Sequence, residues 1–147
     1  MRPVLQTTVG RHGNCYQACV ASILEVPIDE VPDQALGRTP EEYVHILRGW
    51  LAPRGLSLIA ATLGPYTPEE LLPELWHAGY WIAGIATNSR DLDHAVVMRG
   101  NTVVWDPHPT PHNWEPYVAN PHINGIAMFV PLDPAQTFAS AGVATTS

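Results

Sequence analysis

The chain changes from polar to apolar within the stretch Gly13-Asn14-Cys15-Tyr16-Gln17-Ala18-Cys19-Val20-Ala21-Ser22-Ile23-Leu24. Asn14 is a favoured N-cap residue, so the sequence predicts a helix that begins at Cys15 and fades near Glu25. The first turn of a helix carries N–H groups without intrahelical acceptors, which together with the helix dipole favour a negative charge. Cys15 would therefore lie where the thiolate, the reactive form of cysteine, is stabilised.

Composition limits the class of protein. The chain has 147 residues, enough for one domain that buries roughly two-thirds of its unfolded surface. A formal net charge of −7, without a cluster of basic residues, argues against a nucleic-acid partner. Fifteen prolines and eleven glycines indicate many turns and short elements rather than a long-helix bundle, so we expect a mixed α+β domain.

The cellular location follows from what the sequence lacks. Residues 1–6 have no apolar core of a signal peptide, and no stretch of 18 apolar residues occurs elsewhere. The two cysteines, Cys15 and Cys19, are one helical turn apart and would hold too little of the chain together as a disulfide. We therefore expect a cytoplasmic protein without membrane contact.

Two further helices have clear start signals. In Thr39-Pro40-Glu41-Glu42 the threonine is the N-cap, the proline takes the first position and the second glutamate takes the capping-box position. The predicted helix ends near Gly55. The stretch Thr67-Pro68-Glu69-Glu70 repeats this start, and that helix is expected to stop at Gly79. Between the Cys15 helix and the helix that begins at Pro40, residues 28–33 are predicted to form a proline-bounded turn or one helical turn.

Strand patterns dominate the second half of the chain. The candidates are Leu56–Thr62, Tyr80–Thr87, Leu92–Met98, Thr102–Trp105 and Gly125–Leu132. Because the predicted helices come early in the chain and the predicted strands come late, we expect an α+β fold in which the Cys15 helix packs against a mostly antiparallel sheet. We expect one domain over residues 1–132. The Ala/Ser/Thr-rich residues 133–147 have little to bury and are expected to form a flexible tail.

A cysteine nucleophile needs a base, and the base needs an acceptor that orients it. Of the seven histidines, we interpret His12, His45 and His77 as surface or packing residues. His94 is different because it interrupts an apolar strand, where an unpaired ring would carry a desolvation cost. His94 therefore requires a polar partner.

Asp106 is the predicted partner, provided that the hairpin has the right register. With a two-residue Gly100-Asn101 loop, Asp106 would lie on the opposite face of the sheet from His94. With a three-residue loop, Met98 pairs with Thr102 and His94 stands across from Asp106. We expect the three-residue loop. The apolar back face would then consist of Ala95, Val97, Val103 and Trp105.

Less specific interpretations remain open. His94 and Asp106 could be an ordinary buried pair, and Cys15 could be a core residue, as we expect for Cys19. Zinc could bind a set that contains His94, Asp106, His108, His112 and a cysteine, but this spacing is not a recognised ligand pattern, so we expect no metal and no other cofactor. His108 and Asn14 are then candidates for the rim of a cleft.

The segments 13–22, Asp93-His94-Ala95-Val96-Val97 and Trp105-Asp106-Pro107-His108-Pro109 together resemble small phage-associated and bacterial proteins of the papain-like cysteine peptidase superfamily. They are similar, more distantly, to bacteriocin-processing transporter peptidase domains. The resemblance covers about residues 4–109. It implies a papain-like fold and a hydrolase that cleaves a peptide, isopeptide or related amide bond through a thioester, with Cys15, His94 and Asp106 as the triad.

The resemblance also implies an oxyanion hole. Papain-like enzymes typically carry a glutamine before the nucleophile, and its amide acts together with the N–H of the cysteine. Gln6 is the candidate, although it lies nine residues upstream, so residues 7–13 must fold back. Gln17 is the second choice, but its place inside the helix directs it poorly.

Other activities share these residues. A thiol acyltransferase or deamidase would use the same constellation on a peptide or protein substrate. A binding module without turnover, such as a phage-encoded inhibitor of a host protein, is a further alternative, and the five tryptophans would suit an interface.

Overall fold

The structure is a computed structural model that describes residues 1–10, 12–71, 79–87, 94–110 and 115–133. Its helices are α1 (Cys15–Leu24), α2 (Pro40–Leu51), α3 (Pro68–Leu71) and α4 (Glu115–Ala119). Its strands are β1 (Leu56–Tyr66), β2 (Tyr80–Ile85), β3 (His94–Arg99), β4 (Thr102–Trp105) and β5 (Ile123–Pro131). Three short 3-10 turns are η1 (Ile28–Glu30), η2 (Gln34–Leu36) and η3 (Ala52–Arg54).

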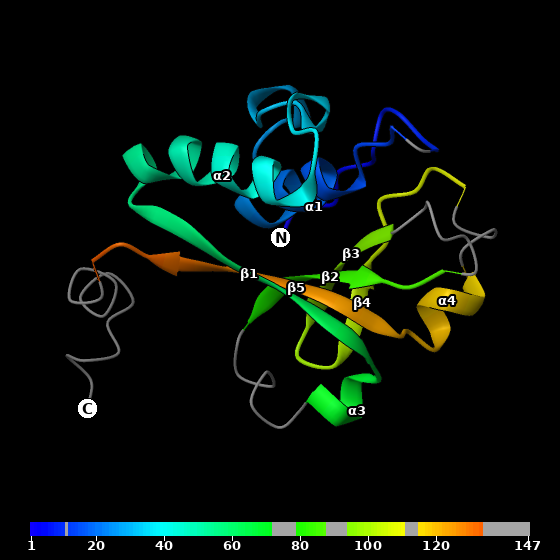
Figure 1. Cartoon of the computed structure of the whole chain (residues 1–147). Coiled ribbons are helices and arrows are strands. Elements are labelled where there is room, and N and C mark those ends of the chain that lie inside the picture. Colours follow the sequence, from blue (N-terminus) through cyan, green and yellow to red (C-terminus); the bar gives the residue numbers. More distant parts are fainter. Residues whose placement is uncertain (11, 72–78, 88–93, 111–114, 134–147) are drawn as a thin grey trace.

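The five strands form one sheet in the order β1-β5-β2-β3-β4, and every described pair is antiparallel. Figure 1 shows α1 and α2 together on one side of this sheet. The prediction of an α+β protein with an N-terminal helix and a mostly antiparallel sheet is confirmed. Within the described ranges, no helix is both long and apolar enough to cross a bilayer.

Both faces of the sheet are covered by apolar side chains. On one face, α1 and α2 bury a cluster that includes Val20 and Leu47, together with Ile82 and Val97 of the strands. Cys19 is fully buried in this cluster, which confirms the interpretation of this residue as a small buried hydrophobe. The second cluster contains Trp81, Ala83, Ile85, Val96, Met98 and Ile123, and side chains of α3 and α4 pack against it.

The helix starts follow their local signals. The Thr39 hydroxyl accepts a hydrogen bond from the N–H of Glu42 at 3.1 Å, so α2 begins at Pro40 as predicted. The Glu42 carboxylate accepts from the N–H of Arg38 rather than from that of Thr39. For α3, a Thr67 and Glu70 capping box is present, whereas residues 72–78 of the predicted helix lie outside the described residues.

The strand boundaries differ from the predicted ones by a few residues. β1 continues to Tyr66, and β5 begins at Ile123, two residues before the predicted start. The first two residues of the predicted strand at 92–98 lie outside the described residues, as do residues 134–147 of the predicted tail.

Candidate active site

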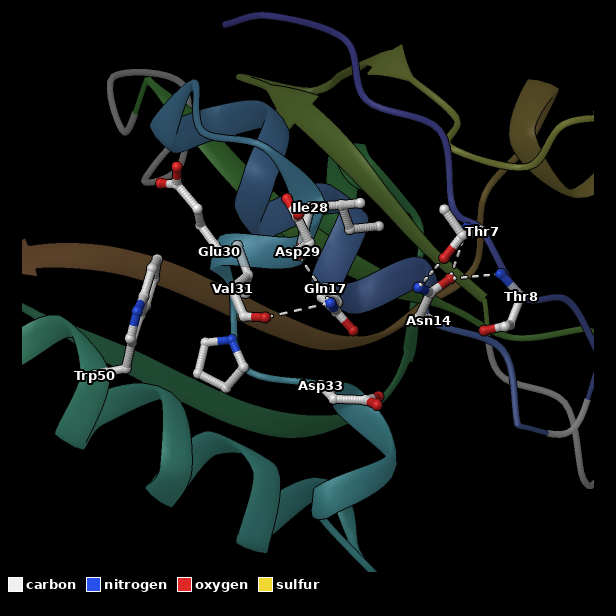
Figure 2. Close-up of a pocket in the computed structure, with 11 residues that line it drawn as sticks. Thr7, Thr8, Asn14, Gln17, Ile28, Asp29, Glu30, Val31, Asp33 and Trp50 are labelled. Atoms are coloured by element: carbon white, nitrogen blue, oxygen red, sulfur yellow. Dashed lines mark hydrogen bonds between the residues drawn. The ribbon is translucent and has the colours of Figure 1, made fainter.

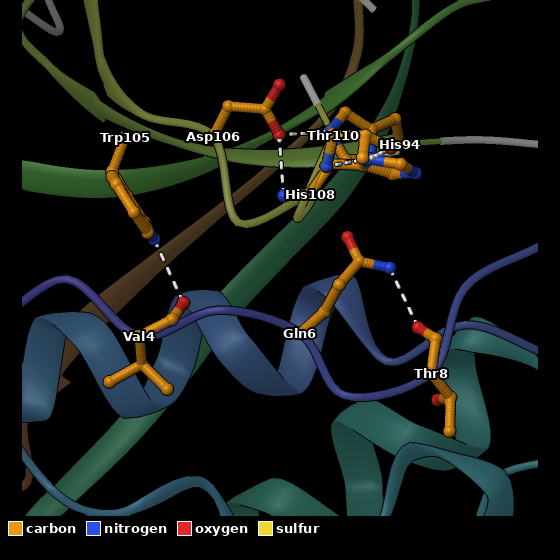
Figure 3. A network of polar contacts seen from close by, with 8 residues as sticks. All are labelled: Val4, Gln6, Thr8, His94, Trp105, Asp106, His108 and Thr110. Atoms are coloured by element: carbon orange, nitrogen blue, oxygen red, sulfur yellow. Dashed lines mark hydrogen bonds and ion pairs between the residues drawn. The ribbon is translucent and has the colours of Figure 1, made fainter. Parts of the chain in front are cut away.

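His94 and Asp106 form a close buried pair. Nε2 of His94 lies 2.6 Å from Oδ1 of Asp106, and the two side chains are 4% and 10% exposed. A carboxylate accepts only, so Nε2 carries the hydrogen of this bond. The same Oδ1 accepts the backbone N–H of His108 at 3.0 Å, which fixes the carboxylate from a second direction (Figure 3). The structure thus brings together the histidine and the aspartate expected to orient it.

The hairpin of β3 and β4 brings these two residues together through a strand register that differs from the predicted one. Arg99 pairs with Thr102, so the loop has two residues, and the predicted three-residue loop is wrong. The register then shifts, because Met98 pairs with Val103 while Val97 pairs with Trp105. This is a β-bulge, in which β4 holds one residue more than β3. When this register is continued by one residue beyond Trp105, the side chain of Asp106 lies on the same face of the sheet as the side chain of His94.

The predicted division into a polar site face and an apolar back face is also wrong. Ala95, Val97 and Trp105 pack in the cluster beneath α1, the helix that carries Cys15, whereas Val103 packs against the opposite cluster. The candidate site therefore lies at the end of the sheet rather than on one face. His94 is the first residue of β3, and α1 begins at the same end of the sheet (Figure 1).

Cys15 completes the group of three. Cys15 lies close enough to His94 for its side chain to act on the protonation of the ring, and the residue is 9% exposed. Burial of the His94 ring opposes its protonation, but the hydrogen bonds to Asp106 and Cys15 and the negative charges of these two groups outweigh burial and raise the pKa of His94 to about 9. By contrast, burial, reinforced by the charges of Cys15 and Asp106, raises the pKa of Cys19 and keeps it a thiol.

The start of α1 is not capped by the side chain predicted for it. Asn14 occupies the N-cap position, but its side chain makes no cap bond. Its Oδ1 instead accepts the backbone N–H groups of Thr7 and Thr8, at 2.9 and 3.0 Å. Gln34 of η2 replaces it, because its Oε1 accepts the N–H groups of Tyr16 at 3.0 Å and Gln17 at 3.2 Å.

This distant cap leaves one donor at Cys15. Among the first-turn amides, the described part of the chain provides no acceptor for the N–H of Cys15. Sequence reasoning missed Gln34, since a glutamine in a short polar turn gives no signal of a partner 17 residues away.

Gln6 is bound to the segment that directly precedes α1. The Asn14 N–H donates to the Thr8 carbonyl at 3.2 Å, and Nε2 of Gln6 donates to the same carbonyl at 2.8 Å. Gln6 is 5% exposed, and its backbone N–H donates to the carbonyl of Pro107 at 2.9 Å, beside Asp106. Its Oε1 is buried and has no hydrogen-bond partner among the residues described.

The side chain of Gln17 forms its hydrogen bonds away from Cys15. Its Nε2 donates to the carbonyls of Ile28 and Val31, and its Oε1 accepts the N–H of Gln34. These bonds join α1 to η1 and η2, so Gln17 has a structural role in this chain.

The other histidines differ in their relation to the site. His108 is half-buried, and its ring centroid lies 6.1 Å from that of His94. Its Nδ1 accepts the N–H of Thr110 at 3.0 Å. His12 and His45 are exposed, as expected for surface residues, whereas His77 and His112 lie outside the described residues.

The arrangement can support nucleophilic chemistry, because the Cys15 side chain, the His94 ring with its raised pKa and the Asp106 carboxylate lie next to one another. The N–H of Cys15 has no acceptor among the described residues. No group of three or more His, Cys, Asp or Glu side chains within the described ranges is placed to hold a metal ion. No family model, no curated protein and no solved structure matches the chain. A proposal for its function therefore rests on this geometry.

Proposed function

We propose that this protein is a papain-like thiol hydrolase that cleaves an amide bond of a peptide or protein through a thioester on Cys15. The observation that carries the proposal is the position of His94, whose Nε2 lies 2.6 Å from the Asp106 carboxylate and whose ring is close enough to Cys15 for that side chain to act on its protonation. A buried pair that served only stability would not need a cysteine at a helix start as its third member. Peptide and isopeptide bonds are both within the proposed class of substrate.

The resting state follows from the charge on His94. With a pKa of about 9, the ring is protonated at neutral pH. In the proposed mechanism this imidazolium lies beside the sulfur at the start of α1 and stabilises the negative charge of the attacking sulfur. Asp106 stabilises the imidazolium and holds the ring in place.

The chemical steps conserve protons. The Cys15 thiolate attacks the substrate carbonyl carbon, a C–S bond forms, and the carbonyl oxygen becomes an oxyanion. His94 then gives its proton to the departing amine nitrogen as the C–N bond breaks, which leaves a thioester and a neutral ring. The ring next takes a proton from water while the hydroxide attacks the thioester. The C–S bond breaks, and the thiolate and imidazolium pair returns.

Two N–H groups are suited to the oxyanion. One is the Cys15 N–H, which lacks an acceptor among the described residues. The other is the second hydrogen of Gln6 Nε2, whose first hydrogen is held by the Thr8 carbonyl. Donors fixed in advance in this way stabilise the developing charge without rearrangement.

Alkylation tests the proposal without knowledge of the substrate. We expect iodoacetamide at pH 7 to modify Cys15 at least about tenfold faster than it modifies the cysteines of the urea-unfolded chain, because the proposed mechanism requires His94 to activate the sulfur in the folded chain. His94→Ala should abolish this advantage. Cys19, which is fully buried, is the internal control, and Cys15→Ala should leave only its slow reaction, as followed by mass spectrometry.

Equal reaction rates in the folded and unfolded chain would contradict the proposal and favour a binding module. Turnover is then measured on a panel of peptide and isopeptide substrates. Gln6→Ala should lower turnover on the order of 100-fold while Cys15 alkylation remains fast, since an oxyanion donor acts only once the substrate is attacked. The chain contains no lysine, so an amine acceptor added to the assay reveals acyl transfer without cross-linking of the protein to itself through lysine.

A further inference from the structure

A cleft of about 680 Å³ lies beside the start of α1. It extends from the N-terminal segment past Asn14 to η1 and to Trp50 of α2 (Figure 2). Ligand sites commonly have about 300–1,000 Å³, which suits several residues of an extended peptide rather than a single side chain. Asn14, one of the two residues predicted for the rim of a cleft, lines it, whereas His108, the other one, is not among its lining residues.

The wall of the cleft is acidic. Asp29, Glu30 and Asp33 line it with exposed side chains, and no ion pair to them is present among the described residues. Trp50 forms part of the same wall. The Arg54 guanidinium of the chain itself lies over the Trp50 ring at 4.0 Å and covers one face of this indole, so the attraction of this wall for a cation comes from the three carboxylates.

The cleft passes the start of α1, next to the residue proposed as the nucleophile. Asn14, which lines it, directly precedes Cys15, and Thr8, which also lines it, holds the amide of Gln6 through its carbonyl. The cleft therefore passes within one residue of the proposed nucleophile, although neither Cys15 nor Gln6 is among its lining residues.

We propose that this cleft binds an extended segment of the substrate and selects one that carries lysine or arginine close to the bond attacked by Cys15. The charge on the wall argues for the basic side chains, and the position of the cleft argues that they belong to the substrate. The inference rests on the proposed hydrolase for its link to cleavage, but the binding itself does not require turnover.

The test uses the full chain with Cys15→Ala, so that a bound peptide is not consumed. Three fluorescent nonapeptides of alanine and glycine carry two lysines, two glutamates or two glutamines, and fluorescence anisotropy at low ionic strength measures their binding. We expect the lysine peptide to bind on the order of tenfold tighter than the glutamine peptide, because three exposed carboxylates each contribute modestly. The glutamate peptide should bind most weakly.

The matched variants separate the cleft from overall charge. Asp29→Asn, Glu30→Gln and Asp33→Asn together remove three charges, and the Asp33→Asn change retains a side-chain oxygen for the Ala35 N–H, which donates to Oδ1 of Asp33 in the wild-type chain. We expect this variant to lose the preference for lysine. Glu41→Gln, Glu69→Gln and Glu115→Gln remove three exposed charges elsewhere and should preserve it.

Equal binding of the three peptides, or an equal loss in both triple variants, would overturn the inference. Preferential binding by the Cys15→Ala chain, together with failure of the wild-type chain to turn over any peptide, would support the cleft and count against the hydrolase. The two proposals can therefore fail separately.

Discussion

Gln17 and Gln34 bind each other in both directions. The N–H of Gln34 donates to Oε1 of Gln17 at 3.0 Å, and the N–H of Gln17 donates to Oε1 of Gln34 at 3.2 Å. The same Gln34 oxygen accepts the N–H of Tyr16. This contact joins η2 to the first turn of α1 and leaves the N–H of Cys15 as the donor that faces no acceptor in the described residues. A structural contact thus shapes the site of the proposed nucleophile.

Gln34→Ala should lower the free energy of unfolding by about 1–2 kcal/mol, since it removes a cap from two buried helix N–H groups. Urea unfolding measures this change. Gln34→Glu keeps an acceptor at the same place, next to a helix N-terminus that favours negative charge, and should restore most of the loss. A similar loss in both variants would show that the capping oxygen is not what stabilises the helix start.

Gly13→Ala should impair turnover without touching the triad. A Cβ at Gly13 would lie 3.0 Å from the carbonyl oxygen of Gly10, 3.2 Å from that of Thr8 and 3.3 Å from Nε2 of Gln6. The amide of Gln6 must therefore shift by a few tenths of an ångström, and we expect turnover to fall on the order of tenfold, with alkylation of Cys15 unchanged.

Gly49→Ala is the control for that substitution. It lies in α2 with no atom within 4 Å of the added Cβ, and it should preserve turnover while it raises stability by up to about 1 kcal/mol. Unchanged turnover in Gly13→Ala would argue against a role for Gln6 in the reaction.

Asp106→Asn should lower the pKa of His94 from about 9, because the side chain keeps its shape but loses the charge that favours the imidazolium. NMR titration of the ring in histidine-labelled protein measures this pKa directly. The alkaline limb of turnover should move to lower pH by the same amount. Glu41→Gln, the same charge change on exposed α2, should leave both unchanged, and an unshifted ring in Asp106→Asn would contradict the pairing.

The raised pKa of His94 also makes stability depend on pH. A folded-state pKa of about 9, against an ordinary value of 6.5, gives a contribution that is complete below pH 6.5 and lost as the pH rises through 9. The shift corresponds to about 3 kcal/mol. Urea unfolding at about pH 6 and about pH 9.5 should therefore show a larger loss of stability for the wild-type chain than for His94→Gln. Equal losses in the two chains would indicate that His94 has an ordinary pKa.

Several features were predictable because their causes lie within a few residues of one another. Thr39 caps α2 across three residues, Thr67 caps α3 in the same way, and the apolar run after Asn14 marks α1. Short apolar segments bounded by turn residues indicated the strands. The need of His94 for a polar partner also followed locally, because a ring in an apolar strand is costly to bury alone.

The sequence by itself therefore determined the class of the fold, the helix that carries Cys15 and the candidate residues of the site. Only the tertiary structure decided the bulge that brings Asp106 to His94, the cap that Gln34 supplies and the acidic cleft beside Asn14. The physical reason is distance along the chain. Strand register and distant caps depend on the sum of many contacts between residues far apart in sequence, and no short pattern encodes that sum.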